Sequence, residues 1–436
     1  MALFRRAKPE PPPPPPVVRT LPVAPPPASE TGLRSFADHR AFVLSQVEPL
    51  MPFGMVLVDA LGLQLAESIR SDVDLPGFDN SAMDGYAVRS VDVAGATRDE
   101  PVTLTVDGVV AAGDVPDGDL AEGVARKIMT GAPLPYGADT VVAYELTDRG
   151  AEQVEVYEGA APGQHIRRRG SDLTENALVA EQGVTLDARL AGVLAGIGID
   201  KVLVHPRPRV VVISTGSELV DPGKPLTRGQ VYDSNSHLMA ACAKQDGAQV
   251  WRVGHVGDDP DQLRQLIADQ LIRADLIVTT GGVSEGDFDI VKQVAGDLGA
   301  VDFCRVGMQP GKPQGFGLIG DDEVPILMLP GNPVSAFVSY ESFVRPVIRK
   351  LMGSTPYVRP AIEAVASGPM RSKHGIVQLA RGKAVRSHEG WSVDLVGGHS
   401  SHLLSDLAKA NALVLLDEET TEVLPGDLVS VWLLDE

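Results

Sequence analysis

The alternation of apolar and amphipathic stretches between residues 208 and 352 indicates strands and helices in turn. The short apolar stretches have the length of buried strands, and the amphipathic ones have helical spacing. The expected strands are PRVVVIST, VWRVGHV, ADLIVTT, VDFCRV and PILMLP. The expected helices are SNSHLMAACAKQ, DPDQLRQLIADQLIR, DIVKQVAGDLG and, capped by Asn332, PVSAFVSYESFVRPVIRKL. This alternation predicts an α/β domain with a mostly parallel sheet that is covered on both faces.

The rest of the chain divides into segments with other patterns. Apolar residues at helical spacing, including Leu57, Leu61, Leu65 and Ile69, predict helices near the N-terminus. Short alternating runs such as VTLTVDGVV indicate small β-structures, and so do the short strands that end in VSVWLL. The predicted organisation is a proline-rich tail (1–31), N-terminal helical segments packing on later domains (32–75), an inserted β-rich domain (76–176), a linker or return segment (177–207), the α/β domain (208–357) and a C-terminal β domain (358–436).

The N-terminal tail contains the runs PEPPPPPP and APPP, which pack neither as helix nor as sheet. Such a segment is either a ligand for a proline-recognising module or a plain extended tail. The second interpretation is the simpler one, and it places residues 1–31 outside the fold.

The charge and the cysteine content exclude several classes of protein. With 58 acidic and 38 basic residues, the formal net charge is −20, which argues against a nucleic-acid or anionic-membrane surface. No apolar run reaches the roughly 18 residues of a membrane span, and the start, MALFRRAKPE, lacks the apolar core of a signal peptide. Two cysteines, Cys242 and Cys304, make neither a disulfide framework nor a structural zinc site. We therefore expect a cytoplasmic protein without nucleic-acid or membrane partners.

Glycine loops follow three of the predicted strands: STGSE (214–218), TTGGVSEGDFD (279–289) and LPGNPVSA (329–336). Ligands bind at the carboxyl ends of the strands in an open parallel sheet. Glycine allows the backbone to approach a ligand, and successive N–H groups can hold an anion. Each loop alone is equally compatible with an ordinary strand-to-helix turn, but three on one edge predict an anion-binding pocket.

Acidic and basic residues accompany these loops. Carboxylates on the same edge favour a site where Mg²⁺ bridges carboxylate and phosphate oxygens, although some of them are expected to be solvated surface groups. These acids are Glu218, Asp258, Asp259, Glu285, Asp287 and Asp289. The turn VGMQPGKPQGFG (306–317) is expected to present Lys312, and HIRRRGSD (165–172) places three arginines beside Asp172. Such cations either bind oxyanions or form solvated charge runs.

The stretch LPGFDNSAMDGYAV, residues 75–88, carries two acids, Asp79 and Asp84, among small residues. Its apolar positions follow neither the helical nor the strand period, so it is predicted to be a loop. The chain contains no GxSxG elbow, HExxH helix or Walker lysine loop, and its histidines lack metal-ligand spacing. The two cysteines are interpreted as buried apolar residues.

Seven motifs of the chain occur in the order found in molybdopterin molybdenumtransferases, the relatives of the gephyrin E domain. They are PGFDNSAMDGYAV, KIMTGAPLP, IRRRGSD, STGSEL, TTGGVSEGD, PGKP and LPGNPVSA. From about residue 32 to its end, the chain resembles this family. The resemblance implies insertion of molybdenum from molybdate into adenylylated molybdopterin with release of AMP, dependent on Mg²⁺.

The resemblance also implies a multidomain architecture and partners. The α/β domain would have a fold similar to the molybdopterin adenylyltransferase, and the C-terminal domain would be a small β-barrel. The protein would be a homodimer with shared active sites, in which Asp84 reaches the site of the other subunit. The adenylyltransferase and the proteins that mature molybdoenzymes are further candidate partners.

The resemblance assigns roles to individual residues. Catalytic roles fall to Asp84, Asp172, Glu218 and Asp289, and metal binding falls to Asp258, Asp289 and Glu218. The implied substrate-binding residues are Thr130, Arg167, Ser214, Thr215, Gly281, Gly282, Ser284, Arg305, Lys312, Gly331, Asn332, Arg381 and Ser401. Where the family often has two lysines ahead of the PGKP turn, this chain has Arg305 and Gln309. This departure alters the anion site and puts the affinity for molybdate in question.

Two other functions are compatible with the same motifs. Adenylyl transfer to molybdopterin would use the same kind of sheet domain, but it would need neither residues 76–180 nor the terminal domain. A scaffold function, as in the gephyrin relative, would not require the acidic residues, which are intact here, although the polyproline segment keeps partner binding open.

Overall fold

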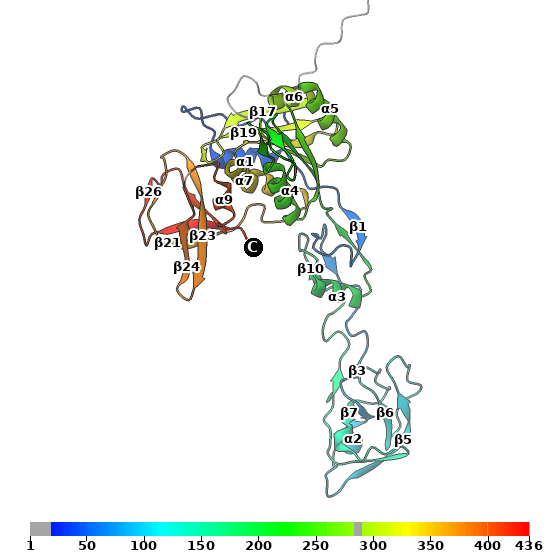
Figure 1. Ribbon diagram of the computed structural model, residues 1–436. Helices are drawn as coiled ribbons and strands as arrows, with labels where there is room; N and C mark the ends of the chain where they lie inside the picture. Colours follow the sequence, from blue (N-terminus) through cyan, green and yellow to red (C-terminus); the bar gives the residue numbers. More distant parts are fainter. Residues whose placement is uncertain (1–18, 258, 283–289, 399, 436) are drawn as a thin grey trace, which may run out of the picture. The chain divides into compact units, whose positions relative to one another are not determined.

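The computed structural model describes residues 19–257, 259–282, 290–398 and 400–435 (Figure 1). Contacts within the chain divide it into two compact units, one formed by Met1–Phe53 with His205–Glu436 and the other by Gly54–Val204. The finer domain boundaries stay predictions. No helix among the described residues is both long enough and apolar enough to cross a membrane.

A six-stranded sheet forms the centre of the first unit. In spatial order its strands are β15 (Gln249–Val256), β12 (Arg209–Thr215), β16 (Leu276–Thr280), β20 (Val324–Leu329), β19 (Pro313–Ile319) and β17 (Gly299–Arg305). The first four run parallel, and β19 and β17 are antiparallel to their neighbours. The predicted mostly parallel sheet is therefore confirmed.

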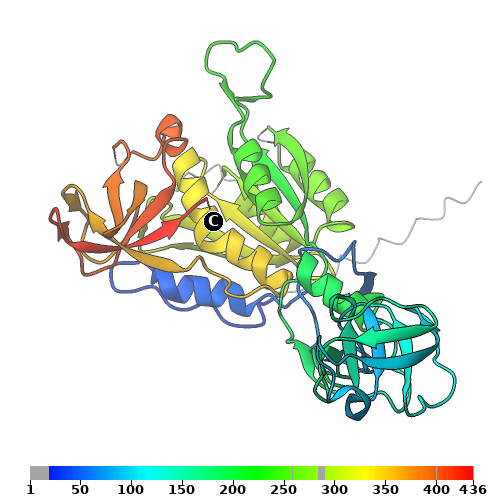
Figure 2. The ribbon, with the colours of Figure 1, turned by 90° about the horizontal axis from the view of Figure 1, so that it is seen from below.

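Helices cover both faces of this sheet, as predicted. They are α4 (Asn235–Gln245), α5 (Pro260–Leu271), α6 (Ile290–Leu298), α7 (Pro333–Ser339) and α8 (Arg345–Leu351), with a π-helical turn, Tyr340–Val344, joining the last two. Alternate residues of β12 belong to different cores, because successive strand side chains point to opposite faces. Val210 and Val212 pack with α4, α7 and α8, whereas Val211 and Ile213 pack with α5 and α6. The long helix that includes α7 and α8, yellow in Figure 2, adjoins the sheet on one side and the C-terminal domain on the other.

Strand β19 corrects the prediction that residues 306–317 form only a turn. The glycines of PQGFG are packing residues, because a Cβ at Gly315 would come within 2.7 Å of the Phe303 ring. A Cβ at Gly317 would likewise come within 2.5 Å of the Val301 side chain. Both neighbours lie on β17, so these glycines allow two antiparallel strands to pair where a sequence pattern indicates a turn.

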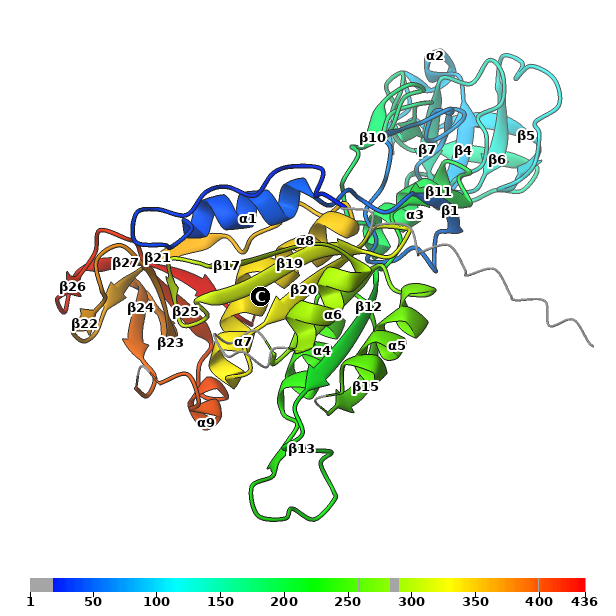
Figure 3. The ribbon, with the colours of Figure 1, turned by 90° about the horizontal axis from the view of Figure 1, so that it is seen from above.

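The N-terminal region differs from its prediction in two ways. Only α1 (Phe36–Ser45) is helical between residues 32 and 75, where the structure describes every residue, and it lies beside α8 (Figure 3). Leu57 and Leu65 do have helical spacing, but a turn that ends at Gly62, with φ +80°, separates them. They are instead buried in a core with residues of the 178–204 region.

Residues 19–31, the described part of the predicted tail, make contacts with the rest of the first unit. Arg19 forms an ion pair with Asp321 at 3.0 Å and donates to the Gly320 carbonyl. The Gln46 side chain exchanges two hydrogen bonds with the backbone of Val23. An extended proline-rich chain has no internal hydrogen bonds, so its backbone groups are available to side chains in this way.

The C-terminal part of the first unit is a small closed β-barrel, as predicted. Its strands are β18 (Met308–Gln309), β23 (Val377–Ser387), β24 (Gly390–Leu395), β21 (Ala361–Ala366), β27 (Leu428–Leu433) and β25 (Ala412–Leu416). A second pairing, between β23 and β25, closes the sheet on itself. A short pair, β22 (Met370–Arg371) with β26 (Glu422–Val423), and the helix α9 (Leu404–Leu407) complete this part.

The second unit contains three smaller cores. Two of them pack on the sheet β7 (Thr140–Ala143), β4 (Gly85–Val88), β6 (Val124–Ile128), β5 (Val102–Val110) and β8 (Gln153–Val156), which is accompanied by the helix α2 (Ser90–Val93) and the 3₁₀ turn Tyr144–Leu146. The pair β3 (Asn80–Ser81) with β9 (Ile166–Arg167) adjoins this sheet in sequence. The third core includes α3 (Ala188–Gly196) and the pairs β1 (Phe53–Val56) with β11 (Lys201–Val204) and β2 (Ile69–Arg70) with β10 (Leu178–Ala180).

The predicted loop 75–88 is in part regular structure. Residues 80–81 form β3, and residues 85–88 form β4, an inner strand of the five-stranded sheet. All four residues of β4 are buried, so no alternation of apolar and polar residues marks the strand. A Cβ at Gly85 would lie 2.0 Å from the Val142 carbonyl oxygen. The glycine after Asp84 therefore permits close pairing of β4 with β7.

This geometry predicts opposite effects for two alanine substitutions in the second unit. Gly85→Ala should lower the free energy of unfolding by about 1–3 kcal/mol, because the new methyl group overpacks the sheet. Gly192→Ala, in the exposed interior of α3 with no atom near its Cβ, should raise it by about 0.5–1 kcal/mol. Urea unfolding followed by circular dichroism measures both. Equal stability of Gly85→Ala and the unsubstituted protein would contradict the assigned packing.

Candidate active site

Three glycine loops meet at one pocket of about 570 Å³ in the first unit. They follow β12, β16 and β20, and the parallel pairing of these strands brings their carboxyl ends to one edge. The loop residues that line the pocket are Thr215, Gly216, Glu218, Gly281, Gly282 and Gly331. The sequence-based prediction of one shared pocket for the three loops therefore agrees with the geometry.

The backbones of the three glycine loops approach one another closely at Gly281 and Gly331. A Cβ at Gly281, where φ is +89°, would lie 2.6 Å from the Thr215 carbonyl oxygen. A Cβ at Gly331 would lie 3.6 Å from the Gly281 Cα. At these glycines the pocket wall is backbone, which suits the binding of an anion by N–H groups.

The buried carboxylate of Asp233, which is 1% exposed, joins the segments beneath this wall. Its Oδ1 accepts from Ser214 Oγ at 2.9 Å and from the Ser236 amide at 3.0 Å. Its Oδ2 accepts from Ser236 Oγ at 2.5 Å, and the Arg252 guanidinium lies 3.9 Å away. Ser214 Oγ also lies 3.0 Å from Thr280 Oγ1, so the ends of β12 and β16 and the start of α4 are linked.

The network changes the interpretation of Ser214, which was predicted to bind substrate. Its side chain is fully buried and its hydroxyl is hydrogen-bonded to protein groups, so it supports the pocket from behind. Sequence reasoning missed Asp233 because an Asp before a helix indicates only a cap. It also missed His402, which lines the pocket from the C-terminal part of the chain.

Glu218 is exposed and lines the pocket beside Gly216. Next in the chain are β13 (Leu219–Val220) and β14 (Val231–Tyr232), and the segment between them extends away from the rest of the unit (Figures 2 and 3). The predicted residues Asp258, Ser284 and Asp289 lie outside the described residues, and so do Glu285 and Asp287. Among the acids of this edge, Asp259 caps α5, where its side chain accepts from Asp261 N and Gln262 N.

Asn332 and Ser401 are in contact with each other. The Asn332 side chain donates to Ser401 Oγ at 3.0 Å, and the Val334 amide donates to the Ser401 carbonyl at 3.1 Å. Asn332 lies at the predicted cap position of α7, but its side chain makes no capping hydrogen bond. These residues therefore join the third glycine loop to the C-terminal part of the chain.

Arg381 has a structural role that the sequence did not indicate. Its side chain is 5% exposed and donates to the carbonyls of Gly398, Ser400 and Leu403. It also lines a cavity of about 20 Å³ together with Pro310 and Val334. The guanidinium thus holds the loop that carries Ser401 and His402.

Arg305 ends β17, and Gln309 and Lys312 lie on the turn that connects it to β19. Arg305 is exposed, and Gln309 and Lys312 are half-buried. The turn is closed by a hydrogen bond from the Val306 amide to the Lys312 carbonyl at 2.7 Å. These residues are not among those that line the 570 Å³ pocket, so the described part of the chain contains a second, separate group of anion-site candidates.

In the second unit, Asp84 and Thr130 are brought together. Asp84 Oδ1 accepts from the Thr130 amide at 2.7 Å and from Thr130 Oγ1 at 2.8 Å. These hydrogen bonds, that of the amide first, stabilise the ionised carboxylate and lower the pKa of Asp84. Because both residues are exposed, the pair presents an ionised carboxylate at the surface of the unit.

The arginine cluster 167–169 divides into structural and exposed members. Arg168 pairs with Asp79 at 2.6 Å, and Arg169 pairs with Asp74 at 2.5 Å and donates its amide to Asp79. Hydrogen bonding by the Arg169 amide, together with the Arg168 guanidinium, lowers the pKa of Asp79. Asp79 is therefore a packing residue. Arg167 and Asp172 are exposed, and among the described residues their side chains have no polar partner.

Comparison with known proteins gives consistent matches along the chain. Three family models match it: the MoeA N-terminal region (domain I and II) at residues 34–198, a probable molybdopterin binding domain at 211–350, and the MoeA C-terminal region (domain IV) at 363–434. Molybdopterin molybdenumtransferase 2 of Mycobacterium tuberculosis is 41% identical over 407 residues, which cover 92% of this chain and 99% of that protein. The chain belongs to the molybdopterin molybdenumtransferase family.

Other molybdopterin molybdenumtransferases agree with this assignment. The protein of this name from Nostoc sp. is 37% identical over 85% of this chain and 86% of its own length. The crystal structure of a molybdopterin biosynthesis MoeA protein from Pyrococcus horikosii superposes with a TM-score of 0.80, at 30% identity, over 92% of this chain and 99% of that one. The predicted family, fold class and transferase type are confirmed. The role of each site residue stays a prediction.

The Asp84–Thr130 contact in this molybdenumtransferase predicts a measurable pKa change. Thr130→Val should raise the pKa of Asp84, because one hydrogen bond to the carboxylate is lost, and Thr130→Ser should keep it low. Since folding lowers this pKa, the ionised Asp84 stabilises the unit above the ordinary aspartate pKa, and that contribution disappears as the pH falls through the folded value. Carbon-13 NMR titration of the carboxylates measures the shift, with Asp79 as internal reference. An unchanged Asp84 pKa in Thr130→Val would contradict the contact.

Proposed function

We propose that this protein inserts molybdenum from molybdate into adenylylated molybdopterin and releases AMP. The observation that carries the proposal is the meeting of three glycine loops at one pocket, in a chain that matches this family over 92% of its length. A pocket of about 570 Å³ is of the size that accommodates a small organic ligand. Backbone N–H groups at the strand ends suit its phosphates.

The chemistry needs no nucleophile from the protein. Burial raises the pKa of Cys242 to about 12 and that of Cys304 to about 12, so both thiols keep their protons. Molybdate is a dianion and must enter a protein of net charge −20, so local cations are required. Arg305 and Lys312, on the turn before β19, are the candidates that we assign to this task.

Mg²⁺ is part of the proposal. The Glu218 carboxylate is a hard oxygen ligand at the edge of the pocket and fits such an ion, and Asp258 and Asp289 would add two more. Asp233 is not a candidate ligand, because Ser214 and Ser236 already donate to both of its oxygens. When bound, the ion would polarise the phosphoanhydride that links AMP to molybdopterin.

We further propose a homodimer in which the second unit of one copy completes the site of the other. Phe78, Met83 and Met129 are 50%, 36% and 44% exposed, and they flank Asp84 and Thr130 in the sequence. Large apolar side chains at the surface favour a covering partner. A cytoplasmic location fits the two free cysteines, since reducing compartments keep thiols unpaired. The adenylyltransferase that supplies the substrate and the molybdoenzyme-maturation proteins are proposed as transient partners.

The decisive experiment measures AMP release from adenylylated molybdopterin with and without molybdate. Molybdate-dependent release is expected, and Asp84→Ala and Glu218→Ala should each reduce it at least about 100-fold, since small losses of positioning have effects of this size. Both variants should stay folded, because exposed carboxylates support little core. If the protein instead forms the AMP ester from molybdopterin and Mg-ATP, the adenylyltransferase function is correct. If neither reaction occurs, the scaffold function is favoured.

Mixing the two inactive variants tests the shared site. After subunit exchange, half of the dimers combine one Asp84→Ala subunit with one Glu218→Ala subunit, and one of their two sites is then intact. Activity should recover to about a quarter of the unsubstituted value. No recovery in mixtures whose exchange is verified by mass spectrometry would contradict a site made by two copies.

The turn between β17 and β19 predicts a change in molybdate affinity. Gln309 brings no charge, and a hydrogen bond to a charged group contributes about 1.5–3 kcal/mol. Gln309→Lys should therefore lower the half-saturating molybdate concentration by about tenfold, at about 1.4 kcal/mol per decade. Lys312→Ala should raise it by more, and AMP release at saturating molybdate should hardly change in Gln309→Lys.

The measurement is a molybdate titration of the three proteins at fixed ionic strength, because salt screens these charges. Gln309→Asn serves as a control that alters the side chain without adding charge. Equal half-saturation in Gln309→Lys and the unsubstituted protein would show that residue 309 does not face the anion.

A further inference from the structure

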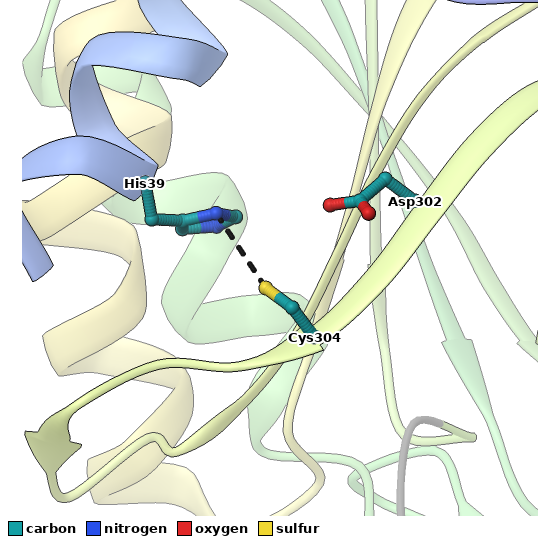
Figure 4. A group of neighbouring side chains, drawn as sticks. All are labelled: His39, Asp302 and Cys304. Carbon is teal, nitrogen blue, oxygen red and sulfur yellow. Dashed lines mark hydrogen bonds between the residues drawn. The ribbon is translucent and has the colours of Figure 1, made fainter. Parts of the chain in front are cut away.

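A cluster of four residues, of which Arg34 and His39 are buried and Asp302 and Cys304 partly buried, lies between α1 and β17. Arg34, 6% exposed, donates from Nη1 to Asp302 Oδ2 at 2.5 Å and from Nη2 to Oδ1 at 3.2 Å. Its Nη1 also lies 3.3 Å from His39 Nδ1, and Cys304 Sγ lies 3.6 Å from the same nitrogen. Figure 4 shows the side chains of His39, Asp302 and Cys304 converging. The cluster thus connects a residue ahead of α1 with the edge strand of the sheet.

The composition of the cluster resembles a metal site. One ligand atom from each of His39, Asp302 and Cys304 lies within 4.8 Å of the others. The cation at this position, however, is the Arg34 guanidinium, which contacts both Asp302 and His39. Burial, aided by the Arg34 charge, lowers the pKa of His39 to about 3, and burial keeps the Cys304 thiol protonated. A metal ion would have to displace Arg34 and remove the thiol proton, so the cluster is built around the arginine.

The backbone of Arg34 holds the turn that carries the candidate anion-binding residues. The Arg34 amide donates to the Arg305 carbonyl, and the Gly307 amide donates to the Arg34 carbonyl, both at 2.7 Å. The Gly307 carbonyl accepts from Val377 at 2.8 Å, and residues 308–309 then pair with β23 of the barrel. The turn therefore leaves one sheet and enters another at the residue that Arg34 holds.

We propose that Arg34 is a positioning residue for molybdate binding, which fixes the turn 305–312 through its paired side chain and its backbone. The inference rests on the function proposed above. With its guanidinium bound to Asp302, residue 34 cannot shift along β17, and its two backbone hydrogen bonds set the direction in which Arg305 leaves the strand. Gln309 and Lys312 follow on the same turn.

Lysine cannot replace arginine here, because an ammonium group cannot make the two parallel bonds of a guanidinium to a carboxylate. Arg34→Lys and Arg34→Met should both raise the half-saturating molybdate concentration, by about tenfold for Arg34→Met. AMP release at saturating molybdate should stay within about twofold, because the 570 Å³ pocket does not include the turn.

A matched control separates positioning from general destabilisation. Arg345 forms another buried ion pair in the same unit, with Asp246 at 3.0 Å, and its side chain is 9% exposed against 7% for Arg34. Arg345→Met should lower the melting temperature comparably and leave the half-saturating molybdate concentration unchanged. Hydrogen–deuterium exchange should become faster at residues 305–312 in Arg34→Met but not in Arg345→Met.

The outcomes distinguish this inference from the proposed function. If the unsubstituted protein shows no molybdate-dependent AMP release, the proposed function is wrong. Hydrogen–deuterium exchange then still tests whether Arg34 fixes the turn. If release occurs but Arg34→Met and Arg345→Met shift the molybdate titration equally, or neither variant shifts it, the positioning role is overturned. One zinc ion per chain in the unsubstituted purified protein would also overturn it, because zinc at His39 and Cys304 requires Arg34 to leave.

Discussion

The hydrogen bonding of Asp233 is the interaction on which the pocket depends. A buried carboxylate is costly unless every oxygen has a partner, and here both oxygens accept hydrogen bonds from residues of different segments. Ser214 fixes the end of β12, its contact with Thr280 fixes the end of β16, and Ser236 fixes the start of α4. The glycine loops can then approach one another without side chains of their own to hold them.

Sequence patterns predicted the sheet well where each strand is a continuous apolar run. The inner parallel strands β12, β16 and β20 were recognised because burial on both faces selects such runs. Strand β19 was missed because Gly315 and Gly317 are there to accommodate Phe303 and Val301 on the neighbouring strand, which no local pattern reveals. The helix expected around Leu57 and Leu65 fails for a similar reason, since their common spacing is compatible with a turn that buries both in one core.

At the candidate site, too, one part of the structure could be predicted from the sequence and another could not. Loops at the ends of parallel strands could be placed together from topology alone, so Thr215, Gly281 and Gly331 were found in one pocket. The direction of a side chain could not be predicted. Arg381 was expected to meet an anion, yet its guanidinium donates to three carbonyls of its own domain, and Ser214 faces Asp233. The family resemblance proposed a set of site residues, but it did not indicate what each side chain contacts.

The turn at residues 305–312 has a consequence for biosynthesis of the protein. Arg34 and Asp302 are separated by 268 residues, and β18 pairs with β23 of the barrel, which is synthesised later. A nascent chain can complete the glycine loops once β20 has emerged, but contacts of such long sequence separation form late. The group of cations on the turn is therefore assembled only after β23 has been synthesised. Until then the glycine loops exist without the strand that holds the turn.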